Sequence, residues 1–283
     1  TGGGDDTIWG NSGTNIINSG AGNDVIYGIG GNNTIYAGSA ADTIYGGTGV
    51  DSIFGEEGND YIFASAGADI IDGGANSDLV DYSSSSTGIN LTLLDSGATV
   101  NVSHNIGGVA SDSLTNIEGI KGSTTASNTL IGNNMNNTLI GGNQTDIIKG
   151  VSGNNSLSGG AGDDTIYGKS GNNSLNGGAN DDIIYAGKGL DTIDGGDGID
   201  TVDYGDATED LIVDIRDGVH VISTSQGTDT FSSIEGVIGG TGKAVAGGAK
   251  ALNDTVGITS AGASRASRRA EQKARQHEDR KAW

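Results

Sequence analysis

The chain contains no cysteine and no proline, and only 5% of its residues are aromatic. Without cysteine it can form neither a disulfide nor a thiolate metal site. It has no apolar run near the length of about 18 residues that marks a transmembrane helix. Hydrophobic residues make up only 34% of the 283 residues, so a conventional two-layer core would be thinly supplied. A stacked repeat needs less, because each unit buries its side chains against its neighbours.

Basic residues are also scarce, with 14 Lys and Arg against 36 Asp and Glu. Residues 264–283 hold seven of the basic residues and three acidic ones, which leaves a net charge of −26 on the rest. A body this acidic repels nucleic acid and anionic membranes, so we expect neither nucleic-acid binding nor membrane insertion. Its self-repulsion should also resist compaction until cations neutralise it.

A nine-residue pattern fills residues 1–81 and, after an interruption, residues 123–203. Position six is Asp or Asn in all 18 units, and position eight is Ile, Leu or Val. Units such as SGAGNDVIY and GGAGDDTIY match G-G-x-G-x-D-x-U-x, a calcium-binding repeat of parallel β-helices. The chain therefore resembles the RTX, or haemolysin-type calcium-binding repeat, family over 162 residues. The resemblance implies an all-β parallel β-roll in a protein that leaves the cell by type I secretion and folds on external calcium.

Nine residues divide into a six-residue turn and a three-residue strand, and two units close one coil. Coils should stack at roughly 4.8 Å, the usual spacing between strands. The aliphatic residue at position eight should point inward, whereas positions seven and nine point outward. Glycines at positions one, two and four should adopt positive φ and let turn carbonyls converge.

Calcium binds six to eight oxygen atoms. By resemblance, each ion lies between successive turns and is held by position-six carboxylates 18 residues apart and by turn carbonyls. The predicted metal ligands are Asp6, Asp24, Asp42, Asp60, Asp78, Asp51, Asp69, Asp146, Asp164, Asp182, Asp200 and Asp191.

Asp and Asn alternate at position six with a period of 18 residues. Odd-numbered units of each array carry almost only Asp, whereas even-numbered units are rich in Asn. We therefore expect one Asp-rich side of the roll with a continuous calcium row. The Asn-rich side should hold few ions, with Asp51/Asp69 its best candidate, and its Asn pairs should be bridged by amide hydrogen bonds or water.

Other interpretations of these residues are weaker. The carboxylates could form a solvated acidic face or favour turns without metal. Zinc is disfavoured by the lack of cysteine and by three scattered histidines, which we expect on the surface or in turns: His104, His220 and His277. Aromatic residues at position nine, such as Trp9 and Tyr27, predict an outer ladder or a docking face for sugar, a partner domain or a neighbouring protomer.

Two longer segments separate and follow the arrays. Residues 82–122 and 204–242 are strand-rich inserts that share two features, Asp81-Tyr82 with Asp203-Tyr204 and Ile117–Ile120 with Ile234–Val237. Each should continue the roll with longer turns or a hairpin. Residues 243–283 form a decayed repeat and a basic tail, disordered or helical. Because the first unit begins with Thr1 in place of glycine, we expect the chain to be part of a larger protein.

No catalytic motif accompanies the repeats, since the chain has neither H-E-x-x-H nor G-x-S-x-G. We therefore expect no enzymatic activity. The favoured function is a calcium-binding β-roll module of a large secreted or cell-surface bacterial protein, with a structural, adhesive or surface-lattice role. Its partners would be calcium, neighbouring protomers, other domains of the parent protein or surface polysaccharide. The alternative is a folding and secretion module of a toxin or of a secreted protease, lipase or polysaccharide-modifying enzyme.

Overall fold

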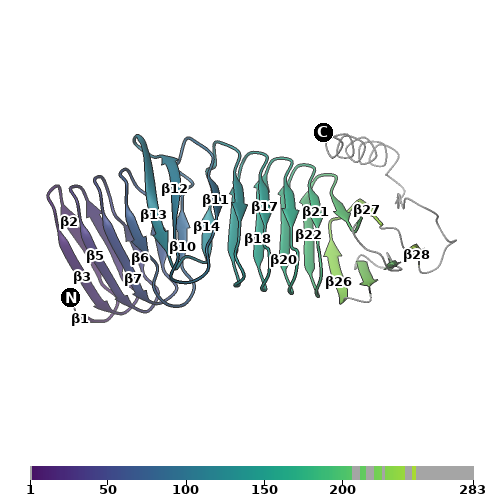
Figure 1. The fold of residues 1–283 in the computed structure, drawn as a ribbon, viewed down its shortest axis with the longest axis horizontal. Helices are drawn as coiled ribbons and strands as arrows, with labels where there is room; N and C mark the ends of the chain where they lie inside the picture. The colour runs from purple at the N-terminus through teal and green to yellow at the C-terminus, as the bar shows by residue number, and fades with distance from the viewer. Residues whose placement is uncertain (1, 206–210, 215–219, 225–226, 240–243, 247–283) are drawn as a thin grey trace.

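The structure, a computed structural model, describes residues 2–205, 211–214, 220–224, 227–239 and 244–246. Every regular element in these residues is a β-strand, and the strands stack into one elongated solenoid (Figure 1). Nearly all strand pairs within the arrays are parallel, which confirms the parallel β-roll. Most of the predicted decayed repeat and the whole basic tail, including His277, lie outside the described residues.

The strands form one 14-stranded sheet and two seven-stranded sheets, and consecutive units alternate between the large sheet and a small one. The large sheet contains, in spatial order, β2 (Thr7–Asn11), β4 (Val25–Ile29), β6 (Thr43–Tyr45), β8 (Tyr61–Phe63), β10 (Leu79–Asp81), β14 (Gly119–Lys121), β16 (Thr138–Gly142), β18 (Ser156–Ala161), β20 (Ser174–Ala179), β22 (Thr192–Asp197), β26 (Gly227–Ser232), β25 (His220–Thr224), β24 (Leu211–Asp214) and β28 (Ala244–Ala246).

The first small sheet contains β1 (Gly2–Gly3), β3 (Ile16–Ala21), β5 (Thr34–Ser39), β7 (Ser52–Glu57), β9 (Ile70–Asp72), β13 (Val109–Thr115) and β12 (Thr99–Asn105). The second contains β11 (Asn90–Thr92), β15 (Thr129–Ile131), β17 (Ile147–Lys149), β19 (Thr165–Tyr167), β21 (Ile183–Tyr185), β23 (Thr201–Asp203) and β27 (Gly236–Ile238).

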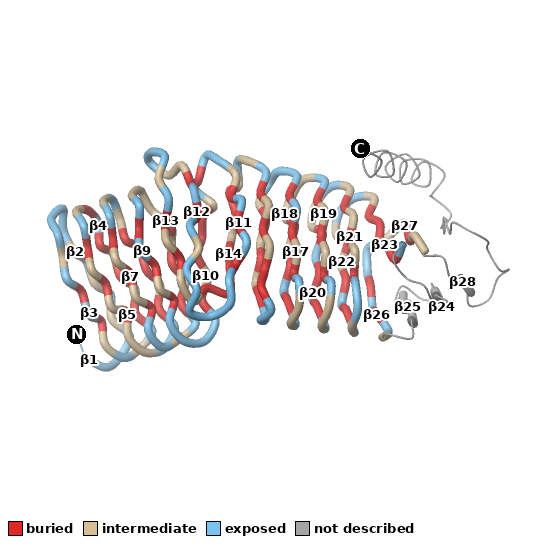
Figure 2. Tube along the Cα trace, in the orientation of Figure 1, coloured by how far each residue is buried: buried red, intermediate tan, exposed pale blue. Residues whose placement is uncertain are grey.

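Position-eight side chains form the core, as predicted. Neighbouring strands pair residues 18 apart, so Ile8 lies beside Ile26 and Ile26 beside Ile44. Ile26 and Ile44 are completely buried, and Ile8 in the first coil is partly buried. Figure 2 shows this inner row of buried residues along both arrays. The aliphatic period of the sequence therefore sets the register of the sheets.

Glycine has two different roles in the turns, and one prediction about it was wrong. Positive φ occurs at positions two and four, as at Gly20 (φ 110) and Gly22 (φ 124), whereas no position-one glycine has it. Position one is close-packed instead. A Cβ added to Gly55 would lie 2.3 Å from both Asp60 Oδ2 and the carbonyl oxygen of Gly73. Glycine there leaves room between a carboxylate and the next coil.

The first insert adds one coil and an antiparallel hairpin, β12 and β13, at the edge of the first small sheet. Strand β14 continues the large sheet between β10 and β16. The second insert forms a similar antiparallel pair, β25 and β26, which extends the large sheet through β22. Hairpins thus continue the roll in both inserts.

The odd number of units in the first array changes which wall carries the Asp-rich units. Odd units of the first array lie in the large sheet, but odd units of the second array lie in the second small sheet. The prediction of one Asp-rich side along the whole molecule is therefore wrong. Nine units make four and a half coils, and the insert adds a whole coil, so the second array begins on the opposite wall.

Candidate calcium sites

The position-six side chains and four carboxylates of the inserts lie in three rows, each at the turn that precedes a row of stacked strands. The long row follows the large sheet and contains Asp6, Asp24, Asp42, Asp60, Asp78, Glu118, Asn137, Asn155, Asn173, Asp191 and Asp229. The first short row contains Asn15, Asn33, Asp51, Asp69 and Asp112. The second short row contains Asn128, Asp146, Asp164, Asp182, Asp200 and Glu235.

A backbone N–H, in most cases from the preceding coil, donates to and orients most of these side chains. The N–H of Asp42 donates to Asp60 Oδ1 in the next coil at 2.8 Å, and the N–H of Asp60 donates to Asp78 Oδ1 at 2.8 Å. The same bond joins Asp146 to Asp164 at 2.7 Å. Predicted ligands 18 residues apart are therefore adjacent in space, each with one carboxylate oxygen held by backbone.

The second carboxylate oxygen has no such partner in many turns. The Oδ2 atom is buried and accepts no hydrogen bond from the described residues at Asp24, Asp42, Asp51, Asp60, Asp78, Asp146, Asp164 and Asp191. Buried polar atoms are almost always satisfied in folded proteins, so a repeated exception indicates a missing counterpart. That counterpart must be a cation or a donor, because a carboxylate oxygen is an acceptor.

Turns with Asn at position six show which atoms a cation or donor in the Asp turns would contact. Asn33 Nδ2 donates to the carbonyl oxygens of Gly31 and Gly46, each at 3.2 Å. Asn155 Nδ2 likewise donates to the carbonyls of Ser152 and Gly153 at 3.2 Å and 3.1 Å. The predicted amide hydrogen bond between paired Asn side chains is present for Asn155, which also donates to Asn173 Oδ1, whereas Asn15 and Asn33 are joined through the backbone N–H of Asn15.

At the same place in the turn, Asp has a carboxylate oxygen where Asn has an N–H donor. In the first array, Asp60 Oδ2 and the carbonyl oxygen of Gly73 both lie close to Gly55. In the second array, Asp164 Oδ2 and the carbonyl oxygen of Gly177 both lie close to Gly159. Oxygen atoms that face one another repel unless a cation lies between them. Carboxylate and carbonyl oxygens are the ligands that calcium prefers, so these turns fit that ion.

Burial raises the pKa of several row carboxylates. Desolvation is the main cause, and like-charged neighbours in the row add to it, so the pKa of Asp42 rises to about 7 and that of Asp164 to about 8. The pKa of Asp78 also rises to about 7, through burial and through the charges of Asp60, Glu118 and Asp72. Backbone N–H donors oppose these shifts without cancelling them.

Without calcium, the fold should therefore become less stable as pH rises from about 4 to about 8. Between these values the folded row binds protons that the unfolded carboxylates, with a pKa of 3.8, have released. Thermal unfolding of calcium-free protein, followed by circular dichroism at pH 5 and pH 8, should give the higher midpoint at pH 5. Saturating calcium should reverse this order, because protons compete with the ion. A calcium-free midpoint that increased toward pH 8 would contradict the assignment of buried, unneutralised carboxylates.

Sequence reasoning missed how the rows end. Tyr82 donates from its hydroxyl to Asp112 Oδ2 at 2.9 Å, and Tyr204 donates to Asp229 Oδ2 at 2.7 Å. These hydroxyls supply the donor that other Asp Oδ2 atoms lack. The shared Asp-Tyr dipeptide of the two inserts was the available signal, but its partners, Asp112 and Asp229, follow 30 and 25 residues later.

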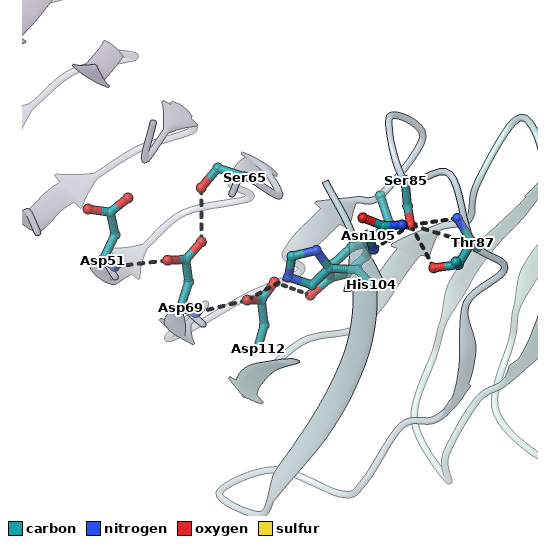
Figure 3. A network of polar contacts seen from close by, with 9 residues as sticks. Asp51, Ser65, Asp69, Ser85, Thr87, His104, Asn105 and Asp112 are labelled. Atoms are coloured by element: carbon teal, nitrogen blue, oxygen red, sulfur yellow. Dashed lines mark hydrogen bonds and ion pairs between the residues drawn. The ribbon is translucent and has the colours of Figure 1, made fainter. Parts of the chain in front are cut away.

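His104 is buried beside this row end, contrary to the prediction that the histidines lie on the surface or in turns. Its Nε2 lies 3.1 Å from Asp112 Oδ1, and Asp112 also accepts the N–H of Asp69 (Figure 3). Burial tends to lower the pKa of His104, but the hydrogen bond and charge of Asp112 outweigh it and raise the pKa. Alternation along the hairpin strand β12 turns this residue inward.

The Asp51/Asp69 pair differs from the other Asp pairs. Ser65 donates from its hydroxyl to Asp69 Oδ2 at 2.9 Å (Figure 3). Asp51 Oδ2 is one of the buried atoms without a hydrogen bond. Asp51 therefore resembles the carboxylates of the Asp-rich rows, whereas Asp69 does not.

No group of three or more His, Cys, Asp or Glu side chains in the described part of the chain is arranged to hold a metal. Each candidate site instead combines carboxylates of neighbouring coils with backbone carbonyls. Such a set of hard oxygen ligands suits calcium and lacks the nitrogen and sulfur ligands of zinc. Within the described residues, no helix is long and apolar enough to cross a membrane.

Position-nine aromatic residues form the predicted ladder. Trp9, Tyr27, Tyr45 and Phe63 stack with ring centroids 5.7, 4.8 and 4.3 Å apart, and Tyr167 stacks on Tyr185 at 4.5 Å. The rings within each stack are nearly parallel, so inner members cover one another's faces. This favours an intramolecular role, since a bound sugar would need an open ring face.

Comparison with known proteins agrees with this geometry. The model of the RTX calcium-binding nonapeptide repeat matches residues 1–26, 27–62, 45–80, 123–157, 140–175 and 167–202. No curated protein matches the sequence. Among solved structures, an extracellular lipase, LipA from Serratia marcescens, is 16% identical, with a TM-score of 0.25; the match covers 75% of this chain and 42% of the lipase. Because the repeat model covers more than half of the residues, the chain belongs to the RTX calcium-binding nonapeptide repeat family.

Proposed function

We propose that this chain is a calcium-binding β-roll that folds when calcium enters its Asp rows. The observation that carries the proposal is the contrast between Asn and Asp turns. The Asn155 amide satisfies the turn carbonyls of Ser152 and Gly153, whereas buried Asp oxygens such as Asp164 Oδ2 accept no hydrogen bond from the described residues. The same turn thus requires positive charge where a position-six Asp has a buried Oδ2 without a donor.

Bound calcium would supply the charge that offsets carboxylate repulsion within each row. The chain contributes a fixed geometry for it. Backbone N–H groups hold Oδ1 of each Asp, which leaves Oδ2 directed at the turn carbonyls. Folding without the ion would bring carboxylates of successive coils together inside a body of net charge −26. Ion binding and coil stacking should therefore be coupled.

We further propose that the roll is a non-catalytic module of a larger secreted or cell-surface bacterial protein, with a structural, adhesive or lattice role after type I export. Family membership and the assignment of its buried carboxylates to metal support this. A second candidate is the folding module of a secreted enzyme or toxin. The purified chain should not hydrolyse protein, lipid or glycan substrates with or without calcium. Reproducible turnover would reject the non-catalytic role.

Counting bound ions tests the calcium assignment directly. Native mass spectrometry of the full chain in excess calcium should show at least about seven ions, one for each adjacent Asp pair in the Asp-rich half of the long row and in the second short row. Magnesium should bind less completely, because it requires near-ideal octahedral geometry at shorter distances. A chain that retained no calcium while keeping its β-structure would overturn the proposal.

A further inference from the structure

Each insert ends in a segment that rebuilds the calcium turn outside the nine-residue pattern. We propose that Glu118 and Glu235 each complete one further calcium site, Glu118 with Asp78 and Glu235 with Asp200. Both lie beyond the last repeat of an array and outside the residues that the repeat model matches. The proposal rests on calcium binding by the Asp rows and extends each Asp-rich row by one ion.

In the repeats, the carbonyl of the next position-one glycine lies beside Asp Oδ2, and a residue of each insert supplies the same carbonyl. A Cβ built on Gly55 would lie 2.3 Å from Asp60 Oδ2 and 2.3 Å from the carbonyl oxygen of Gly73. A Cβ on Gly73 would lie 2.6 Å from Asp78 Oδ2 and 2.3 Å from the carbonyl oxygen of Asn116. The Asn116 carbonyl therefore takes the place of the next position-one glycine. In the second array the Ser233 carbonyl takes that place beside Gly195 and Asp200 Oδ2.

The position-six carboxylate of the repeat also has a counterpart in each insert. Within the row, the N–H of Asp60 donates to Asp78 Oδ1 at 2.8 Å. At the row ends, the N–H of Asp78 donates to Glu118 Oε2 at 3.1 Å, and the N–H of Asp200 donates to Glu235 Oε2 at 2.9 Å. Each Glu thus occupies the next position-six place.

A longer side chain compensates for a shorter turn. In a repeat, position six follows the position-one carbonyl by five residues, whereas Glu118 follows Asn116 by only two. Asn116 and Ser233 adopt left-handed backbone, with φ of 51° and 53°, which turns the chain sharply. The extra methylene of Glu then carries its carboxylate to the row, which an Asp in this shortened turn would not reach.

The surroundings of Asp78 indicate that the site between Asp78 and Glu118 requires a cation. Its side chain is 1% exposed, and its Oδ2 accepts no hydrogen bond from the described residues. Two further acceptors lie next to it: the Asn116 carbonyl is beside Oδ2, and Glu118 Oε2 accepts the N–H of Asp78. The ends of the Asp112 and Asp229 rows differ, because tyrosine hydroxyls supply donors there.

Substituting the two glutamates tests the inference. Glu118→Gln keeps the shape of the side chain and an acceptor for the Asp78 N–H, but it removes the charge. Native mass spectrometry in saturating calcium should show one ion fewer for Glu118→Gln, one fewer for Glu235→Gln and two fewer for the double variant. Glu57→Gln, which removes the same charge from an exposed side chain, should leave the ion count unchanged.

The outcomes separate this inference from the proposed function. A wild-type chain that binds no calcium would reject both. A wild-type chain that binds calcium, with glutamine variants that bind equally many ions, would reject only the Glu sites and leave Glu118 as a hydrogen-bond acceptor. If a variant fails to fold, wild-type crystals soaked in terbium decide the matter. An anomalous peak between the Asp78 and Glu118 carboxylates supports the site, and its absence beside filled Asp60/Asp78 positions overturns it.

Discussion

In excess chelator the chain should lose most of its β-structure, and millimolar calcium should restore it. Carboxylates such as Asp42, Asp60 and Asp78 lie buried in successive coils, and one oxygen of each accepts no hydrogen bond from the part of the chain that the structure describes. The core that opposes their repulsion is essentially one aliphatic side chain per unit. Because the ion binds the folded rows and not the dispersed chain, its binding free energy adds to that of folding.

Far-UV circular dichroism and size-exclusion chromatography measure this transition. We expect a coil-like spectrum and an expanded chain in chelator, then a cooperative gain of β signal and compaction on calcium addition. Sodium chloride at the same ionic strength is the control for simple screening, which weakens repulsion without satisfying the buried oxygens. A chain that stayed compact and fully β-structured in chelator would show that the aliphatic core and Asn rows suffice.

Replacing an Asp row by an Asn row should make half of the molecule independent of calcium. In the variant Asp146→Asn/Asp164→Asn/Asp182→Asn, each new amide can donate to turn carbonyls as Asn155 and Asn173 do. Three of the like charges along the second short row disappear at the same time. We expect substantial β signal in chelator, where wild type has little, and the loss of about three ions in calcium, because each removed pair held one divalent ion.

The reverse exchange in the same array is a matched control. Asn137→Asp/Asn155→Asp/Asn173→Asp replaces three satisfied amides of the long row with carboxylates. This variant should be less structured than wild type in chelator and should gain ions in calcium. Equal behaviour of both triple variants in chelator would show that the amide bonds contribute little and that charge alone sets the calcium dependence.

Local chemistry made the repeat architecture predictable from sequence. Residues such as Ile8, Ile26 and Ile44 recur every 18 positions and pair directly in the sheet. Each Asp that precedes them falls beside the Asp 18 residues later. Periodicity carries this information because every coil repeats the same contacts, so one unit describes its neighbours. Position-one glycine was recognised as necessary, but its role is close packing and not positive φ.

The sequence by itself therefore determined the β-roll, its register, its aromatic ladder and the identity of the position-six carboxylates in the rows. Only the tertiary structure decided which wall each row occupies and how the rows end. The contacts of Tyr82 with Asp112 and of Asp78 with Glu118 span 30 and 40 residues through inserts that have no nine-residue period. Where a contact does not recur along the chain, the path of the backbone alone brings the two side chains together.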